Sequence, residues 1–288
     1  MSSREADLPD QTAFGGTAID ETGSGQTGGT VAPPRTAGPL SGGPWVALGS
    51  IAALLLLWCV LSLLQTNPRL LPGPWVVGPL IAREAASGAL FSNMAATLTR
   101  VALSFVLAMA IGLALGLFMG RNRRADRWLD PWLIVFLNLP ALVTIVLAYL
   151  WIGLNETAAV LAVAANKIPT VVVMVREGAR ALDPRLDDMA RVFRMGRVAR
   201  LRHVVAPQLA PYVAAAGRSG IALIWKIVLV VEFLGRSNGV GFQIHLYFQL
   251  FDVGMVLAYA LSFIAVMLLI EALIFQPWER WVTAWRRP

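Results

Sequence analysis

Six long apolar runs, separated by short polar or basic segments, dominate the chain from residue 45 onward. Each run is about 20 residues long, which is the length that an α-helix needs to cross the hydrocarbon core of a bilayer. The pattern therefore predicts an all-α, polytopic membrane protein with six transmembrane helices. The predicted spans are 45–65, 98–120, 131–153, 156–175, 208–232 and 254–275.

Two segments outside these runs have a different character. Residues 1–44 are rich in Gly, Thr, Ser and Pro and lack an apolar face, so we expect a disordered tail, with residues 45–288 forming one transmembrane domain. The tail is too long and acidic for the n-region of a signal peptide, which predicts that the first span is retained. Residues 71–93 begin with Pro-Gly-Pro and continue with a mixed helical pattern, which predicts an external helix near the membrane surface.

Composition and charge agree with a membrane protein and orient it. The chain is 57% hydrophobic and 14% charged, whereas soluble domains are about 25% charged. Its arginines concentrate in the segments 121–127 and 176–202 and in the C-terminal tail. The positive-inside rule then places both termini and these segments in the cytoplasm, and predicts a multi-pass protein of a bacterial plasma membrane. Because the basic residues flank spans, we expect contact with membrane lipid and no nucleic-acid binding.

No combination of residues indicates catalysis or metal binding. The sequence has no GxxxxGK[ST] motif, so nucleotide hydrolysis would need another polypeptide. His203 and His245 are expected on opposite sides of the membrane, and neither Ser104 nor Ser219 has a base beside it. Cys59 is the single cysteine. We expect no enzymatic activity, no metal site and no cofactor in this chain.

The segment from about residue 184 to 207 is the most patterned part of the chain. Leu186, Met189, Ala190 and Phe193 recur at helical spacing, and a turn at Gly196 precedes a second basic helix. The apolar stripe could dock in a groove on a partner protein while the arginines hold acidic partner residues. Alternatively, an amphipathic helix of this kind could rest on anionic lipid.

Ionisable residues inside the predicted spans are candidates for a solute path. The chain has only two lysines, Lys167 and Lys226, and both lie within apolar runs. Such residues are costly at membrane depth and normally face a polar interior or a partner. One hypothesis is a path that attracts anions; the alternative is structural pairing with Glu156, Glu271 or Asn138. The candidates for the path are Lys167, Arg218, Lys226, Glu232 and Asn138.

Small residues and prolines mark further features of the spans. Gly112, Gly116 and Gly120 form a bare stripe that allows another helix to approach closely, either within the chain or across a dimer seam. Pro140 and Pro169 are expected to interrupt the third and fourth spans, as plain kinks or as parts of a pathway.

The segment DMARVFRMGRVARLRHVVAP, residues 188–207, resembles the cytoplasmic signature loop of ABC importer permeases. The segment begins with an acidic residue, Asp188, followed two residues later by Ala190. Gly196 lies near its middle, and it ends with a β-branched residue three positions before a proline, Val204 and Pro207. LPGPWVV at 71–77 and VVEFLGRSNGVGFQI at 230–244 are similar to nitrate, sulfonate and taurine-type permeases, and the likeness covers about residues 66–287. Two departures stand out: Arg194 occupies the usual glycine position, with Gly196 two residues later, and Ala206 replaces the usual leucine.

The resemblance implies a fold, partners and a role for the loop. It implies the type I importer permease fold, a homodimer, an ATP-binding subunit dimer that holds ATP and Mg²⁺, and an external solute-binding protein. It implies that a small anionic solute enters the cytoplasm by alternating access; an ATP-independent channel or secondary carrier is the alternative. The residues implied to couple the loop to the ATPase are Asp188, Met189, Ala190, Phe193, Gly196, Val204 and Pro207.

Overall fold

A computed structural model describes residues 44–65, 67, 69–275 and 277 of the chain. The chain divides into two units, residues 1–51 and 52–288, and the described part of the first unit is the beginning of one helix. The predicted disordered tail lies outside the described residues. Every regular element that the structure describes is helical. The α-helices are α1 (Pro44–Leu64), α2 (Pro74–Ala86), α3 (Ala89–Arg121), α4 (Arg123–Asn138), α5 (Ala141–Ile152), α6 (Glu156–Arg180), α7 (Pro184–Val192), α8 (Arg197–Arg200), α9 (Ala206–Gly235), α10 (Val240–Gln249) and α11 (Val253–Ile270), with π-helical turns at Leu201–Val205 and Glu271–Phe275.

The apolar helices correspond to the six predicted spans. Four helices are long and apolar enough to cross a membrane, at 89–121, 156–180, 197–235 and 253–273. Helices α4 and α5 together make a fifth, broken span, and α1 contains a shorter apolar helix at 48–64. The prediction of an all-α, six-span membrane protein is confirmed. The predicted external helix after the first span is α2.

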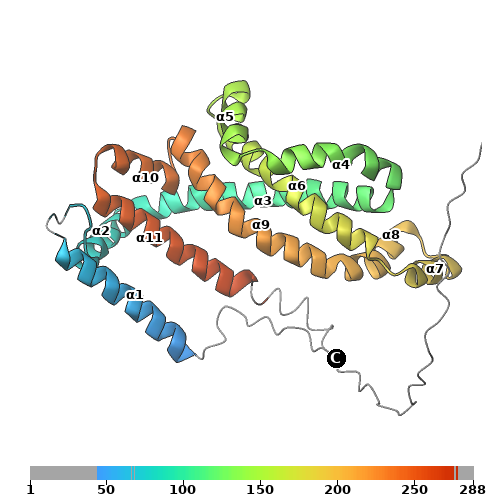
Figure 1. Cartoon of the computed structure of the whole chain (residues 1–288), viewed down its shortest axis with the longest axis horizontal. Coiled ribbons are helices and arrows are strands. Elements are labelled where there is room, and N and C mark those ends of the chain that lie inside the picture. Colours follow the sequence, from blue (N-terminus) through green and yellow to red (C-terminus); the bar gives the residue numbers. More distant parts are fainter. Residues whose placement is uncertain (1–43, 66, 68, 276, 278–288) are drawn as a thin grey trace, which may run out of the picture. The chain divides into compact units, whose positions relative to one another are not determined.

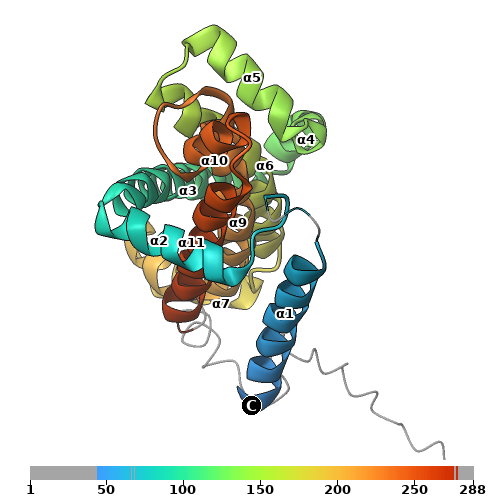
Figure 2. The same cartoon turned by 90° about the vertical axis from the view of Figure 1, so that its left-hand side faces the viewer.

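Proline acts differently at the two predicted interruptions. At Pro140 the third span breaks, and α4 and α5 are bent by 97° (Figures 1 and 2). Leu139 takes the extended conformation that the residue before a proline prefers, so the helix stops there. At Pro169 the helix does not end, since α6 continues through this residue, and the alternative of a plain kink stays a prediction. Helix α10, which follows α9 closely, was not predicted.

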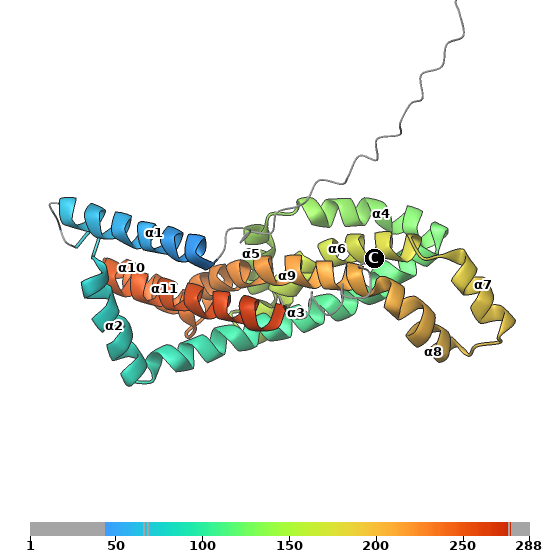
Figure 3. The same cartoon turned by 90° about the horizontal axis from the view of Figure 1, so that it is seen from below.

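The centre of the unit 52–288 is formed by α3, α6 and α9, which lie side by side (Figures 1 and 3). Gly112, Gly116 and Gly120 face α6, whose contacting residues are also four apart. A β-carbon on Gly116 would lie 2.7 Å from the Cβ of Val175 and 2.8 Å from the carbonyl oxygen of Val172. The glycine stripe is therefore occupied within the chain, which excludes it as a dimer seam.

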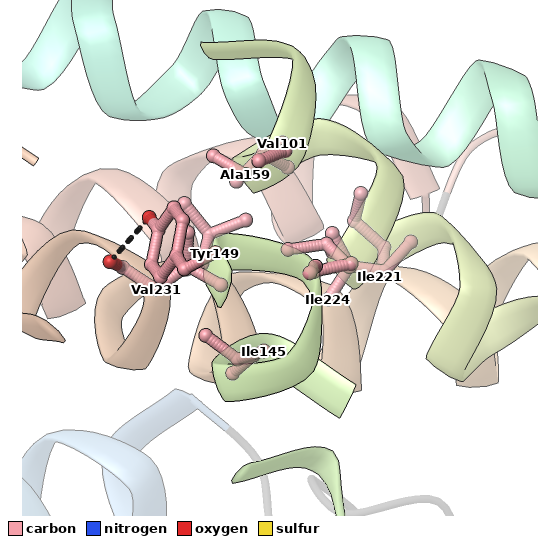
Figure 4. Close-up of a cluster of buried hydrophobic side chains, with 12 residues drawn as sticks. Val101, Ile145, Tyr149, Ala159, Ile221, Ile224 and Val231 are labelled. Atoms are coloured by element: carbon pink, nitrogen blue, oxygen red, sulfur yellow. Dashed lines mark hydrogen bonds between the residues drawn. The ribbon is translucent and has the colours of Figure 1, made fainter. Parts of the chain in front are cut away.

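A hydrophobic core joins α5 to these three helices. Val101, Ile145, Ile224 and Val231 are buried together, and the Tyr149 hydroxyl donates to the carbonyl oxygen of Val231 at 2.9 Å (Figure 4). This core holds the helix that follows the 97° bend.

Candidate functional site

Helices α7 and α8 form a hairpin between the end of α6 and the start of α9 (Figure 3). The Asp183 side chain caps α7 by accepting from the backbone N–H of Arg185 at 2.8 Å, and Pro184 occupies the first helical position. Both residues favour a helix start at this point. The Asp183 carboxylate accepts a hydrogen bond from a backbone N–H of the first turn that has no acceptor within the helix, and Pro184 has no N–H that would need one. The predicted pair of helices in this segment is present.

The turn between these helices depends on residue 194. Arg194 has a left-handed backbone, with φ +49°, whereas Gly196 has φ −61° and caps α8. A non-glycine residue in this conformation pays a steric cost between Cβ and the following carbonyl. The chain thus makes its left-handed turn at the position where the resembling family has glycine, but with an arginine.

An ion pair fastens α7 to α8. The Arg200 guanidinium donates to both oxygens of Asp187, with Nε at 2.6 Å from Oδ1. These hydrogen bonds hold the pKa of Asp187 below its usual value. Asp188, the acid that the resemblance singled out, is instead exposed and lies 3.9 Å from a guanidinium nitrogen of Arg191. Sequence reasoning missed Asp187, although its spacing of three from buried Ala190 places both on one face of α7.

Several apolar side chains of the hairpin project away from the rest of the protein. Val192, Phe193 and Val198 are 79%, 73% and 80% exposed. Such exposure of adjacent large apolar residues is typical of an interaction surface. We call these three residues the docking knob. Of the remaining predicted loop residues, Met189, Gly196 and Pro207 are exposed, and Ala190 and Val204 are buried.

A charge lies on the exposed face of α9 at membrane depth. Lys226 is exposed, and so are Ala222 and Val230, one turn before and one turn after it. The span ends at Gly235, so about 13 Å of helix rise separate Lys226 from that end. This places the charge near the middle of a hydrocarbon core about 30 Å thick. Arg218, half-buried, lies two turns earlier on α9 beside a cavity of about 380 Å³.

The other candidates for the path lie elsewhere. Lys167 is 2% exposed between α6 and α9, with Nζ 3.5 Å from the carbonyl oxygen of Ser219. Its stem passes Gly220, where a β-carbon would lie 3.2 Å away. Asn138 is exposed at the end of α4 and donates to the carbonyl oxygen of Ile134 at 2.8 Å. The five candidates do not form one cluster in this structure, and their common path remains a prediction.

Glu232 belongs to a buried ion network. It is 0% exposed, and its Oε1 accepts from Arg100 on α3 at 2.6 Å. Its Oε2 accepts from the Thr97 hydroxyl at 2.9 Å and from the backbone N–H of Gly241 at 2.8 Å. Gly239 has φ +107°, and a β-carbon there would lie 2.5 Å from the carboxylate, so only glycine fits.

The network continues to α6. Arg100 also donates to Glu156 through two nitrogens, at 2.6 and 2.8 Å, and Arg236 donates to the same carboxylate at 2.6 Å. The prediction that Glu156 pairs with an intramembrane lysine is therefore wrong. Sequence reasoning missed Arg100, although an arginine at the start of an apolar run was a visible signal.

Comparisons with known proteins agree with this geometry. Residues 108–276, more than half of the chain, match the family described as binding-protein-dependent transport system inner membrane component. The chain is 30% identical over 199 residues to the aliphatic sulfonates transport permease protein SsuC of Escherichia coli, covering 69% of this chain and 75% of that protein. It is 25% identical over 253 residues to the taurine transport system permease protein TauC of Escherichia coli, covering 86% and 92%. It is 29% identical over 249 residues to the bicarbonate transport system permease protein CmpB of Synechococcus elongatus, covering 82% and 88%.

Solved structures show the same fold. The MetNI methionine ABC transporter, in an inward-facing conformation, matches with a TM-score of 0.53 and 18% identity, over 65% of this chain and 92% of that chain. An amino acid ABC transporter matches with a TM-score of 0.52 and 23% identity, over 69% and 96%. The matched family has no enzymatic activity of its own and works with ATPase and solute-binding partners. The chain belongs to the binding-protein-dependent inner membrane components and is the membrane-spanning permease subunit of an ABC importer.

Proposed function

We propose that this permease imports a small oxyanion through a path that the exposed face of α9 forms together with a second copy of the chain. The observation that carries the proposal is Lys226, a charge exposed near the middle of a membrane span. An ammonium group facing lipid at this depth costs several kcal/mol, so this face needs a polar covering. A second α9 and the water between the two copies would supply it.

The charge on this face suits an anion. Lys226 and Arg218 are both cations on α9, and one carboxylate, Glu271, lines the cavity beside Arg218, so the path keeps a net positive charge where the solute leaves bulk water. The relatives' names refer to sulfonates, taurine and bicarbonate. Sulfonate and bicarbonate groups are compact oxyanions, and taurine carries a sulfonate. We assign the solute to this chemical class.

The docking knob would deliver the energy of ATP hydrolysis. Exposed Val192, Phe193 and Val198 would enter an apolar groove on an ATPase subunit that binds ATP and Mg²⁺. The Asp187–Arg200 pair would keep α7 and α8 moving as one body. Motion of the ATPase pair would reach α9 directly, because the π-helical turn Leu201–Val205 joins α8 to α9 without a loop. A solute-binding protein would deliver the anion at the opposite membrane face.

Lys226 and Lys167 provide a matched pair for the test. Lys226→Met deletes the exposed charge and keeps the stem, and should lower uptake of the anion at least about five-fold, corresponding to about 1 kcal/mol or more in the barrier. Lys226→Arg should retain more activity. Lys167→Met removes a charge that is buried between α6 and α9, away from the exposed face of α9, and should lower uptake less than Lys226→Met does. Wild-type uptake in Lys226→Met, at normal expression and ATPase assembly, would contradict the proposed path.

The docking knob has its own test. Phe193→Ser should reduce co-purification of the ATPase subunit and uncouple ATP hydrolysis from uptake, because the apolar contact is lost. Phe91→Ser is the control, since Phe91 is a similarly exposed phenylalanine, 66% exposed, on the first turn of α3. Equal ATPase recovery in both variants would remove the docking role from the hairpin.

The orientation is tested by reporters. The arginine distribution supports an orientation with the hairpin and both termini in the cytoplasm of a bacterium and the permease in its plasma membrane. A reporter fused after Arg202 should be active in the cytosol, and one fused near Asn238 should be active outside. The opposite result would put the docking knob outside the cell, where it could not contact a cytoplasmic ATPase, and would contradict the docking proposal.

A further inference from the structure

A large basic cleft lies beside the docking hairpin. Its volume is about 1060 Å³, and its walls come from the α3–α4 junction, the end of α6, the hairpin and the start of α9. Six arginines and three aspartates line it, an excess of three positive charges. The arginines are Arg121, Arg123, Arg127, Arg180, Arg191 and Arg200, and the aspartates are Asp126, Asp183 and Asp187.

The aspartates leave most of the arginine donors unused. Arg200 occupies both oxygens of Asp187, so Arg121 and Arg191 reach that carboxylate only at 3.7 and 3.4 Å. A guanidinium has five N–H donors in a planar fork. One carboxylate shared by three arginines therefore leaves donors that can bind a further anion.

The other two aspartates are also engaged. Asp126 pairs with Arg176 at 3.3 Å and with Arg180. Asp183 caps α7. Neither carboxylate pairs with Arg123 or Arg127 on the α4 wall of the cleft.

Two arginines on that wall lack a carboxylate altogether. Arg123 and Arg127 lie one turn apart at the start of α4, so their side chains share a face of the helix. Within the described residues, neither makes an ion pair, and both are exposed. The Asn122 side chain, which accepts from the N–H groups of residues 124 and 125, fixes this turn. The two guanidinium groups are thus held on one wall without a counter-charge.

The cleft lies at the level of the membrane surface. Trp128 and Trp132 follow on α4 and are 71% and 59% exposed, and indole rings favour the headgroup region of a bilayer. Basic pockets at the ends of membrane helices bind phosphate-bearing headgroups. The same donor geometry would also suit a soluble phosphate.

From this we infer that the cleft is an anion site for a phosphate-bearing ligand, held by Arg121, Arg123 and Arg127 at the α3–α4 junction and by Arg191 of the hairpin. Residues of the hairpin form part of the site, so an occupied cleft would hold the docking knob in one position. The inference rests on the cleft itself and does not require the proposed path or the docking of an ATPase.

The experiment measures binding to the full-length protein in a neutral detergent by native mass spectrometry. One arm titrates cardiolipin against phosphatidylcholine, and the other titrates inorganic pyrophosphate. Arg123→Gln/Arg127→Gln should weaken binding of at least one probe ten-fold or more, and Arg123→Lys/Arg127→Lys should restore most of it. Arg194→Gln/Arg197→Gln removes the same charge from the hairpin outside the cleft and should change binding less than two-fold.

The outcomes separate the sources of the ligand. Saturable binding of cardiolipin alone assigns the cleft to a lipid headgroup, and binding of pyrophosphate alone assigns it to a soluble phosphate. If neither probe saturates, or if both glutamine pairs weaken binding equally, the inference is overturned. ATPase co-purification should be normal in Arg123→Gln/Arg127→Gln. The anion site and the docking of the ATPase are therefore tested by different measurements, and either proposal can fail without the other.

Discussion

Arg100 and Glu232 are 132 residues apart in the chain, yet the Arg100 guanidinium lies 2.6 Å from the Glu232 carboxylate. Their side chains are 4% and 0% exposed, so the pair is buried between α3 and α9. Glu156 on α6 completes the bridge. One guanidinium therefore ties together the three central helices at the end that leads into α10.

Glu232→Gln should destabilise the protein by about 3–5 kcal/mol, because it leaves the buried Arg100 charge without its fully buried carboxylate partner. Thermal unfolding in detergent measures the effect. Glu177→Gln is the same chemical change in a pair whose carboxylate is 50% exposed, and should cost no more than about 1 kcal/mol. Similar losses in the two variants would show that the buried network adds little.

Gly116→Ala should destabilise the packing of α3 on α6 by about 1–3 kcal/mol. The added methyl group would lie 2.8 Å from the carbonyl oxygen of Val172, a backbone atom that cannot rotate away. Gly78→Ala in α2 meets nothing within 4 Å, and should be neutral or stabilising by up to about 1 kcal/mol. Melting temperatures of the two variants compare these effects, and a tolerated alanine at 116 would mean that the two helices can separate at little cost.

Arg194→Gly should stabilise the hairpin by about 1 kcal/mol, because glycine adopts a positive φ without the steric cost that arginine pays. Hydrogen exchange of the α7 and α8 amides reports this locally. Gly196→Ala is the control: its φ of −61° suits alanine, and a β-carbon there meets nothing within 4 Å. Faster exchange in Arg194→Gly would indicate that the arginine side chain contributes contacts that outweigh the strain.

The hairpin should loosen in acid. The hydrogen bonds from Arg200 lower the pKa of Asp187 in the folded state. A carboxyl group with a depressed pKa stabilises the fold above its unfolded pKa, about 3.9, and loses that contribution as the pH falls through the folded value. The protection factors of the α8 amides, which compare each exchange rate with that of an unfolded peptide at the same pH, should therefore be unchanged from pH 7 to 5 and fall below about pH 4. Asp187→Asn should exchange faster at neutral pH and lose the acid dependence; an unaltered acid response would assign it to another group.

The helices themselves were largely predictable from the chain. Hydrophobic runs of the right length appear directly in the sequence, because a membrane span is a continuous helix that satisfies its own backbone hydrogen bonds and exposes apolar side chains to lipid. The same holds for α2, whose Pro-Gly-Pro start is local, and for the helices of the hairpin. Helix α10 escaped prediction because its 10 residues mix polar and apolar side chains and form no run of span length, and its position depends on contacts with α9 and α11.

The sequence by itself determined the all-α membrane class, the six apolar segments and the hairpin as the most patterned loop, since these depend on local spacing and hydropathy. Only the tertiary structure decided which side chains meet. It assigned the glycine stripe to α6, joined Arg100 to Glu232 and Glu156, buried Lys167 and exposed Lys226. Helical periodicity shows that a residue lies on a face, but the neighbour of that face depends on how the helices pack, which spacing along one helix does not encode.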